Sequence, residues 1–581
     1  MRKVELIEYL VIGLYLVFML GTGLLFRRLV SNFYDYFKGG SRGSWWMVGA
    51  SAFMASFSAW TFTGASGVAY MAGISVAMIF VANVIGYLVN FFFTAHLFRQ
   101  LRATTFPEVI RARYNVLTQQ AYVWIGIIPG ILMASLTLYG VAIFANAIFG
   151  FSIQNIIIVL GIVVLLYSTI GGIWSVMATD FLQTLILMPM AILMTYLSLK
   201  YVGGPGAMVE KIKAMELHGM LKLIDNTGKT PYSWIWSLAL ITFVILTYNS
   251  LGSAVRFFYC KDGKEARKAS LFAAILMLTG CFIWFIPPIV ARLEFSSLVE
   301  AVKIQKPAEA SYAVIAMQLL PNGLSGLMVV AMFSATMSSL DTILNQTAAV
   351  MTQDIYKPFK LSLLGSSLKK KELFVVGQVI SFLTGSGIIL AALYFSKQEG
   401  SGVFQYMLDF GALFGTPMIV PMFLSTFIRK TPSWSAMASI IAGFCFSIMS
   451  HQWGLGYAHT VFSIAAAGSV TFMATTLFWK YESKKYKEKV DDFYKVMHTP
   501  VDFEKEIGKS ADASQLNMIG AISMLIGFFI SLLVFLKNPF SGRMQILAVG
   551  AGMMAIGAIF LTLGIRSVKK QKNLQENNHE S

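Results

Sequence analysis

Charged residues are scarce in this chain. Asp, Glu, Lys and Arg make up 13% of the 581 residues, whereas 56% are apolar. A soluble domain carries about 25% charged residues, so most of this chain is not built to face water. This composition excludes a soluble enzyme or a soluble binding domain and favours a large helical bundle in a lipid bilayer.

Cysteine and histidine are also rare. The three cysteines, Cys260, Cys281 and Cys445, show no spacing that predicts a disulfide or a zinc site. Most of the six histidines lie in predicted loops, and His96 stands alone in an apolar run. Because a membrane enzyme needs titratable groups that converge at one depth, we predict that the protein is not an enzyme.

The excess of basic residues has a membrane explanation. The formal net charge is +17, which could indicate nucleic-acid binding. However, the basic residues lie in short loops between apolar runs, as in Lys261–Lys268 and Lys369–Lys371. The positive-inside rule accounts for this pattern, so we predict no nucleic-acid partner. It predicts a protein of the plasma or inner membrane, with the N-terminus outside and the C-terminus in the cytoplasm.

Apolar runs recur along the whole chain. A spanning helix needs about 20 mostly apolar residues, and we predict about fifteen such helices in an all-α polytopic membrane protein. The predicted spans are 6–26, 45–71, 74–98, 119–150, 153–172, 174–200, 232–257, 269–292, 321–353, 373–396, 402–428, 433–453, 459–479, 516–537 and 544–565.

The predicted loops differ in kind. Two long ones, Tyr201–Tyr232 and Leu293–Leu320, have room for short surface helices. The charged stretch Lys480–Gln515 is interpreted as a cytoplasmic amphipathic linker. The polar, basic tail after Ile565 is predicted to be disordered.

Polar side chains gather within an otherwise apolar stretch, Ser325–Pro358. On a helix, Ala335, Ser338 and Ser339 stand at i, i+3 and i+4 and share one face. Polar groups at membrane depth normally face a cavity, a partner or an ion. Hard cations are held by oxygen ligands, and a neutral set would suit Na⁺. The alternative is that the Ser339 hydroxyl bonds back to the Ala335 carbonyl.

Two other apolar runs carry helix-breaking residues. Ser, Thr and Gly are dense between Ser56 and Gly67, and a similar set occupies Thr247–Arg256. In Ser56–Gly67 such residues lower helix propensity and predict a break, because broken backbone within a membrane is tolerated where it lines a cavity. The alternative is close packing of helices through small residues.

Three motifs carry a resemblance to a known family. A-x-x-S-S-L-D at Ala335–Asp341, followed by N-x-x-A-x-x-x-x-x-D-I-Y-K-P at Asn345–Pro358, resembles the signature of the sodium/solute symporter family, which includes proline and glucose cotransporters. Ser168–Gln183 resembles the family's G-G-x-x-A/S-V-x-x-T-D-x-x-Q motif, and His498–Glu506 is similar to a late loop of its glucose-cotransporter members.

The resemblance, which extends over most of the chain, implies a LeuT-like fold. Such a fold has a core of five plus five helices in inverted repeats, with discontinuous helices in corresponding positions. The implied units are an extra helix and loop (1–44), a first repeat (45–200), an outer loop (201–231), a second repeat (232–428), and extra helices with a linker at 480–515 and a tail (429–581).

The resemblance also implies Na⁺-coupled import of a small organic solute, either neutral and sugar-like or an amino or organic acid. Its expected sodium ligands are the carbonyls of Met54, Phe57 and Ala335 and the hydroxyls of Ser338 and Ser339. The solute pocket is expected between the two broken helices. Its candidate lining residues are Ser58, Trp60, Thr61, Asn90, Tyr248, Asn249 and Ser250.

Several assignments keep two interpretations. Asp180 is either a step on the sodium exit path or a packing carboxylate bonded to a neighbouring hydroxyl. Trp60 either stacks on a sugar ring or fills the core. Asp341 either attracts a cation or pairs with a basic side chain. The sugar-binding positions of glucose-carrying relatives read Ser250–Gly252 and Leu408 here, which leaves the solute open.

Two competing functions remain at this stage. A sodium-independent transporter of the same fold would share the composition. A nutrient sensor built on a transporter scaffold usually needs an attached signalling domain, and the predicted tail is short for one. The expected partners are Na⁺, a small solute and the lipid bilayer.

Overall fold

The computed structural model of this protein describes residues 5–26, 39–227, 230–304, 306–364, 370–398, 403–508, 510 and 512–580. The described part is almost entirely helical; its only recorded β feature is a bridge between Gly43 and Cys260.

The helices of the first half are these: α1 (Leu6–Phe26), η2 (Gly39–Ser41), α3 (Trp45–Ala55), α4 (Ala59–Phe62), α5 (Gly64–Ala72), η3 (Gly73–Ala77), α6 (Met78–Val89), η4 (Asn90–Thr94), α7 (Ala95–Gln100), α8 (Phe106–Arg113), α9 (Val116–Phe149), α10 (Ile153–Val202), α11 (Pro205–Ala214) and η5 (His218–Leu221).

The helices of the second half are these: α12 (Trp234–Tyr248), η6 (Leu251–Tyr259), α13 (Gly263–Ile283), α14 (Ile286–Glu294), α15 (Ser296–Glu300), η7 (Pro307–Ala310), α16 (Ser311–Leu319), α17 (Leu324–Val350), η8 (Met351–Tyr356), α18 (Lys357–Leu364), α19 (Lys370–Phe395), α20 (Val403–Phe410), η9 (Gly411–Gly415), α21 (Thr416–Phe427), α22 (Ser435–Gln452), α23 (Tyr457–Thr475), η10 (Thr476–Tyr481), α24 (Lys484–His498), α25 (Phe503–Glu506), α26 (Asp512–Leu532), η11 (Leu533–Phe535) and α27 (Phe540–Glu580).

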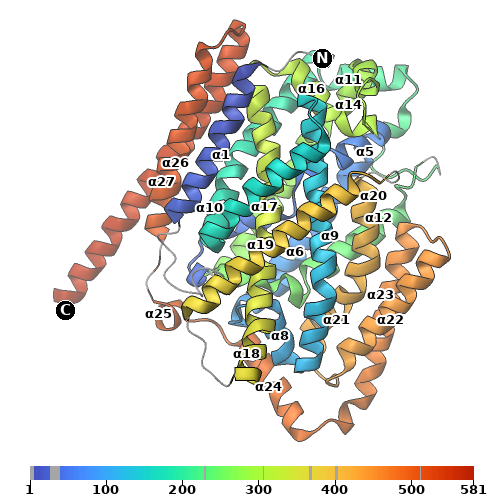
Figure 1. The fold of residues 1–581 in the computed structure, drawn as a ribbon, viewed down its shortest axis with the longest axis vertical. Coiled ribbons are helices and arrows are strands. Elements are labelled where there is room, and N and C mark those ends of the chain that lie inside the picture. The colour runs from blue at the N-terminus through green and yellow to red at the C-terminus, as the bar shows by residue number, and fades with distance from the viewer. Residues whose placement is uncertain are drawn as a thin grey trace.

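Helix α17 lies in the middle of the bundle, surrounded by α1, α3, α9, α10 and α19 (Figure 1). Nearly all its side chains from Leu324 to Ala349 are buried. The pair α26 and α27 covers one flank beside α1, and the pair α22 and α23 covers the opposite flank. The serine stretch is therefore enclosed by protein rather than by lipid.

The helices begin where the sequence supplies caps. Asn115, Ser233 and Asp262 accept the backbone amides that open α9, α12 and α13, which satisfies donors that a helix start leaves free. Gly150 and Gly203 end α9 and α10 in the left-handed conformation, where glycine has no Cβ to clash.

The predicted number of spans is not confirmed. Among the described residues, 10 helices are long and apolar enough to cross a membrane, or up to 11 if the bent pair α12–η6 is counted as one. The shorter apolar helix Trp45–Ala55 falls below that length because α3 ends at Ala55. The spans predicted at 153–172 and 174–200 both lie within α10.

The predicted loops are largely as expected. The short helices α11 and η5 occupy the first long loop, while α15 and η7 lie in the second. In the linker, α24 buries Tyr486, Val490 and Phe493 on one face. The disordered tail is wrong as a prediction, because α27 continues to Glu580. Its lysines, glutamines and glutamates are good helix formers, which the prediction underweighted.

Candidate functional site

The first predicted break is present. Helix α3 ends at Ala55 and α4 begins at Ala59. The Ala52 carbonyl, which loses its helical partner here, accepts hydrogen bonds from Ser56 Oγ at 3.1 Å and Tyr87 Oη at 2.8 Å. The Met54 carbonyl accepts the Phe57 amide at 3.1 Å within the same turn. The polar residues of the sequence thus satisfy part of the broken backbone locally.

The second half of the site comes from α17. Ser339 Oγ lies 3.3 Å from the Phe57 carbonyl oxygen and 3.4 Å from the Ala335 carbonyl oxygen. The back-bond to Ala335 expected as an alternative is therefore present, but the same hydroxyl also reaches the break in the first helix. Residues about 280 positions apart in the sequence meet here, as Ser339 and Phe57 do.

Ser338, the neighbour of Ser339 on α17, brings a second hydroxyl oxygen to this region. Its side chain is fully buried, and its hydroxyl makes no hydrogen bond of standard geometry. It interacts instead with the Asp180 carboxylate of α10. Because a buried hydroxyl without a hydrogen bond of standard geometry is costly, a ligand that contacts this oxygen would be stabilising.

Asp180 is fully buried between α3 and α17. Its Oδ2 accepts a 2.5 Å hydrogen bond from Ser51 Oγ, and its Oδ1 accepts none. Arg256 of η6 donates to the Ser51 carbonyl oxygen at 3.2 Å. Asp180 thus has the neighbouring hydroxyl that a packing role predicts, and it also lies beside Ser338, as an ion path requires. Both interpretations stay open.

Sequence reasoning missed a contribution from α1. Tyr15 Oη accepts hydrogen bonds from Ser334 Oγ at 2.7 Å and from Gln183 Nε2 at 3.0 Å. At the start of α17, Glu8 Oε1 accepts the Ser325 hydroxyl at 2.9 Å. Glu8 is charged and Tyr15 is polar, and both lie in an otherwise apolar helix. These two polar positions were the signal that the sequence offered.

Asp341 and Asp354 bind to other elements of the bundle. Ser168 of α10 donates to Asp341 Oδ1. The Asp354 carboxylate in η8 accepts hydrogen bonds from Thr105 Oγ1 at 2.8 Å and from Gln119 Nε2 at 2.7 Å. These bonds tie the end of the serine helix to the segment before α8 and to α9.

The second predicted break is also present, and it is satisfied by its own neighbours. Helices α12 and η6 meet at an angle of 55°. Asn249 Nδ2 donates to the Gly86 carbonyl at 3.2 Å, while Asn249 Oδ1 accepts Thr94 Oγ1 at 2.7 Å. Asn90 Nδ2 donates to Thr94 Oγ1 at 2.8 Å and to the Tyr248 carbonyl at 3.1 Å. Of the predicted solute residues, Asn90 thus bonds directly to Tyr248 and is linked to Asn249 through Thr94.

The other candidate solute residues are more varied. Ser58 and Thr61 are buried beside the first break, and Thr61 Oγ1 makes no hydrogen bond. Trp60 is half-buried, with its ring 6.0 Å from that of Phe404. Ser250 Oγ donates to the Thr247 carbonyl at 3.1 Å and lines a cavity of about 290 Å³.

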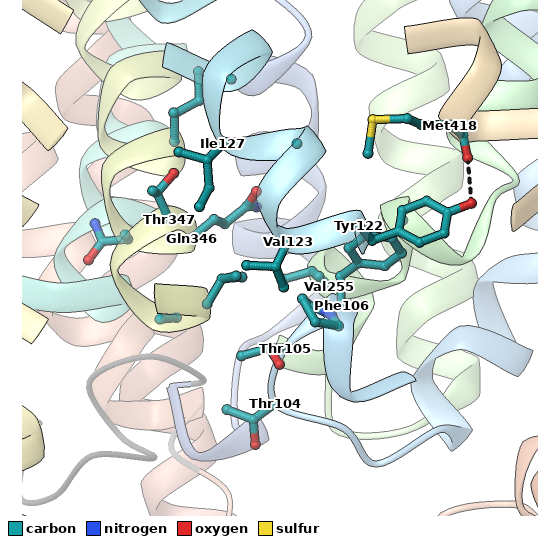
Figure 2. Close-up of a pocket in the computed structure, with 18 of the residues that line it drawn as sticks. Thr104, Thr105, Phe106, Tyr122, Val123, Ile127, Val255, Gln346, Thr347 and Met418 are labelled. Carbon is teal, nitrogen blue, oxygen red and sulfur yellow. Dashed lines mark hydrogen bonds between the residues drawn. The ribbon is translucent and has the colours of Figure 1, made fainter. Parts of the chain in front are cut away.

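An adjoining cavity of about 280 Å³ lies toward the end of the bundle that carries α8 (Figure 2). Its lining is uncharged and mixes aromatic rings with hydroxyl and amide groups from α9, η6, α17 and the segment before α8. The principal lining residues are Thr104, Thr105, Phe106, Tyr122, Gln346 and Thr347. Ligand pockets have this kind of apolar wall with a few polar groups.

A third cavity, of about 400 Å³, lies beside α5. Glu309 of η7 lines it and is only 6% exposed. Burial raises the pKa of the Glu309 carboxyl to about 7, against the opposing influence of Lys306. Sequence reasoning missed Glu309 because its loop was expected to lie on the surface.

Comparison with known proteins places the chain in a family. Residues 36–443 match the model of the sodium:solute symporter family. The sodium/glucose cotransporter of Vibrio parahaemolyticus is 27% identical over 468 residues, which cover 76% of this chain and 84% of that protein. Sodium/myo-inositol cotransporter 2 of Sus scrofa is 26% identical over 474 residues, covering 76% and 69%.

Solved structures show the same fold. A Na⁺-coupled sialic acid symporter in a substrate-bound outward-open state superposes with a TM-score of 0.70 at 20% identity, covering 82% of this chain and 98% of that one. MHP1, a nucleobase-cation-symport-1 family transporter, gives a TM-score of 0.50 at 13% identity, covering 80% and 100%. The predicted fold class, an all-α LeuT-like membrane protein, is confirmed.

Proposed function

Because this chain belongs to the sodium:solute symporter family, we propose that it imports a small, neutral, hydroxyl-rich solute together with Na⁺. Family membership and the many apolar helices make it a multi-pass membrane transporter, not an enzyme, with Na⁺ as its coupling ion. The identity of the solute, the ion ligands and the orientation are parts of the proposal.

The contact between Ser339 and the Phe57 carbonyl carries the sodium assignment. Two ligands at right angles, each about 2.4 Å from an ion, are about 3.4 Å apart, taking the distances typical of Ca²⁺, an ion of similar radius. The oxygens of Phe57, Ala335 and Ser339 are separated by 3.3 and 3.4 Å. Met54, in the same turn as Phe57, and Ser338, beside Asp180, would complete a neutral oxygen set.

Asp180 is proposed as the next oxygen group on the ion's exit path. It lies beside Ser338, and one of its carboxylate oxygens accepts no hydrogen bond. A carboxylate next to a neutral cage would stabilise Na⁺ as it leaves, because opposite charges attract strongly where water is excluded. The positive charge of Arg256, which donates to the Ser51 carbonyl, would limit this attraction so that Na⁺ can still dissociate.

The solute proposal rests on the uncharged cavity. None of the residues lining the cavity in Figure 2 is charged. A carboxylate-bearing solute would be expected to meet an Arg or Lys there. Aromatic faces with hydroxyl and amide groups suit a neutral, hydroxyl-rich molecule, as in the sugar and inositol named for the relatives. Ser58, Trp60, Thr61 and Ser250 are the candidate contacts nearer the two breaks.

Coupling would follow from the broken helix. Na⁺ held between α17 and the break would fasten the two together and favour one access state, which is the differential affinity that coupling needs. We place the end carrying α8, α18 and α24 in the cytoplasm. Basic residues concentrate in its loops, as the positive-inside rule requires, and the two described chain ends lie at opposite ends of Figure 1.

Uptake into proteoliposomes tests the function. Labelled glucose, myo-inositol, sialic acid and an amino acid would be offered with an inward Na⁺ gradient and with K⁺ replacing Na⁺. We expect accumulation of a neutral polyol above its external concentration only with the gradient. Equal uptake in Na⁺ and K⁺ would overturn the coupling, and accumulation of a charged solute alone would overturn the solute class.

A further inference from the structure

Arg102 has an unusual backbone and an unusually complete set of bonds. Its φ of 55° lies in the left-handed region, which non-glycine residues adopt at a cost. Its guanidinium forks onto Glu506, with Nε and Nη2 each 2.7 Å from a carboxylate oxygen. It also donates to the carbonyls of Gln100, Thr499 and Pro500. All parts of the side chain are used at once.

The partner of Arg102 belongs to a strap, defined here as residues 484–506 with α24 and α25, that crosses the α8 end of the bundle. Lys489 of the strap donates to the carbonyls of Arg111 and Tyr114 at the end of α8, each at 2.7 Å. The fully buried Arg113 donates to Tyr486 Oη at 3.0 Å. The strap is thus anchored on α8 independently of Arg102.

The segment held by Arg102 has a second face. Residues 104 and 105, just after Arg102, line the cavity in Figure 2. Thr105 also donates to Asp354, at the end of the helix that carries Ser338 and Ser339. The segment 101–105 therefore lies between the strap on one side and the cavity and serine helix on the other.

We propose that Arg102 is a positioning residue for the transport cycle, which holds the segment 101–105 against Asp354 and so limits access to the cavity from the α8 end. A bidentate Arg–carboxylate pair fixes direction as well as distance. The strained backbone at residue 102 favours release of the segment once the fork opens. The strap thereby sets the balance between closed and open forms of this end.

This proposal rests on the proposed function only where uptake is measured. An accessibility test needs no transport. A reporter cysteine at Thr347, a cavity residue, would be introduced with Cys260, Cys281 and Cys445 replaced by alanine. Its rate of modification by a membrane-impermeant thiol reagent would be followed in nanodiscs, in K⁺ buffer, where both ends are accessible.

Two variants disrupt the Arg102–Glu506 ion pair, one from each partner: Arg102→Ala and the near-isosteric Glu506→Gln. We expect about fivefold faster modification in each, and the double variant to match Arg102→Ala, because the contact that Glu506→Gln weakens is already absent there. Asp491→Asn is the matched control. It weakens the pair between Asp491 of the strap and Arg429, which follows α21; the Nη2 and Oδ1 atoms of this pair lie 2.5 Å apart. This variant should leave the rate unchanged.

Uptake supplies the second measurement. If the closed form is less populated, the apparent affinity for external Na⁺ falls in proportion. We expect the Na⁺ concentration for half-maximal uptake to rise about fivefold in Glu506→Gln, with the maximal rate within twofold of the parent. A purely structural role would lower protein yield or maximal rate without moving this constant.

Unchanged modification in both folded variants, or faster modification in Asp491→Asn as well, would overturn the positioning role. Absence of Na⁺-dependent uptake in the parent protein would contradict the proposed function instead, and the reporter rates would still decide the role of Arg102.

Discussion

The two helix breaks are alike in sequence and unlike in structure. Both consist of small and polar residues within an apolar run, at the starts of the predicted repeats. At the first, the Phe57 carbonyl meets Ser339 of a distant helix across 3.3 Å. At the second, Thr94 Oγ1 accepts a hydrogen bond from Asn90 Nδ2 and donates one to Asn249 Oδ1, so the bonds run between side chains of the break and its immediate neighbours.

The difference teaches where a ligand can act. Broken backbone within a membrane must be satisfied by something. At the second break, the Asn90 and Asn249 side-chain amides bond to the Thr94 hydroxyl and to the Tyr248 and Gly86 carbonyls. At the first break, the Ser339 hydroxyl donates across the long distances of 3.3 and 3.4 Å to the Phe57 and Ala335 carbonyl oxygens, and the proposed function puts a cation among these oxygens.

Removing the two α17 hydroxyls at the first break, those of Ser338 and Ser339, should have the largest effect on transport. A polar group that contacts a charged partner contributes about 1.5 kcal/mol or more to its binding, and the double variant removes two such groups. We therefore expect Ser338→Ala with Ser339→Ala to raise the Na⁺ concentration for half-maximal uptake about a hundredfold. Thr336→Ala is the control, since Thr336 Oγ1 bonds only to Met332 of its own helix. Unaltered Na⁺ dependence in the double variant would remove the sodium assignment.

Removing the Asn249 hydrogen bonds at the second break should lower the free energy of unfolding instead. Asn249→Ala leaves the Gly86 carbonyl and the Thr94 hydroxyl without this partner. We expect a loss of about 2 kcal/mol in unfolding free energy, measured by denaturation in detergent, because buried polar groups become unsatisfied. The Na⁺ dependence of uptake should stay within twofold. A tenfold change there would show that both breaks serve the ion.

Asp180→Asn should slow transport without abolishing solute binding. The amide keeps the size of the side chain but removes the charge beside Ser338. We expect the maximal rate of coupled uptake to fall about tenfold, equivalent to about 1.4 kcal/mol, while solute binding in detergent changes less. A rate equal to that of the parent protein would favour the packing interpretation, in which only the Ser51 hydrogen bond matters.

Met54→Leu should have the smallest effect. If Met54 and Phe57 contribute carbonyl oxygens, the identity of the side chain matters little, and this exchange conserves volume. We expect the Na⁺ dependence to change less than twofold in the uptake assay. A large change would indicate that the side chain itself shapes the ion site.

Local chemistry predicted much of this arrangement. The density of Ser, Thr and Gly identified the first break, and the spacing of Ala335, Ser338 and Ser339 placed them on one face of a helix. These are properties of neighbouring residues in the sequence. The family motif added the expectation that the two places meet, which periodicity alone does not contain. The second break was expected from the order of the apolar runs together with the family resemblance.

Long-range partnership was beyond the sequence. That Asn249 would bond to Thr94, or Tyr15 to Ser334, depends on how helices far apart in the chain pack. The predicted number of spans was not confirmed among the described residues; hydropathy assigned one span to 45–71, whereas α3 ends at Ala55. Arg102 gave no signal of its own, since an arginine in a short basic loop is explained by orientation alone.

The first helix has a consequence for how this protein can be handled. Glu8 and Tyr15 of α1 are the partners of Ser325 and Ser334 on α17, and a Cβ at Gly326 would lie 2.9 Å from the Glu8 backbone. Trimming α1 would turn a row of hydroxyls toward hydrocarbon and loosen the helix that carries Ser338. The N-terminal segment therefore braces α17, and if α17 holds the ion as proposed, shortening α1 should weaken cation retention before it unfolds the bundle.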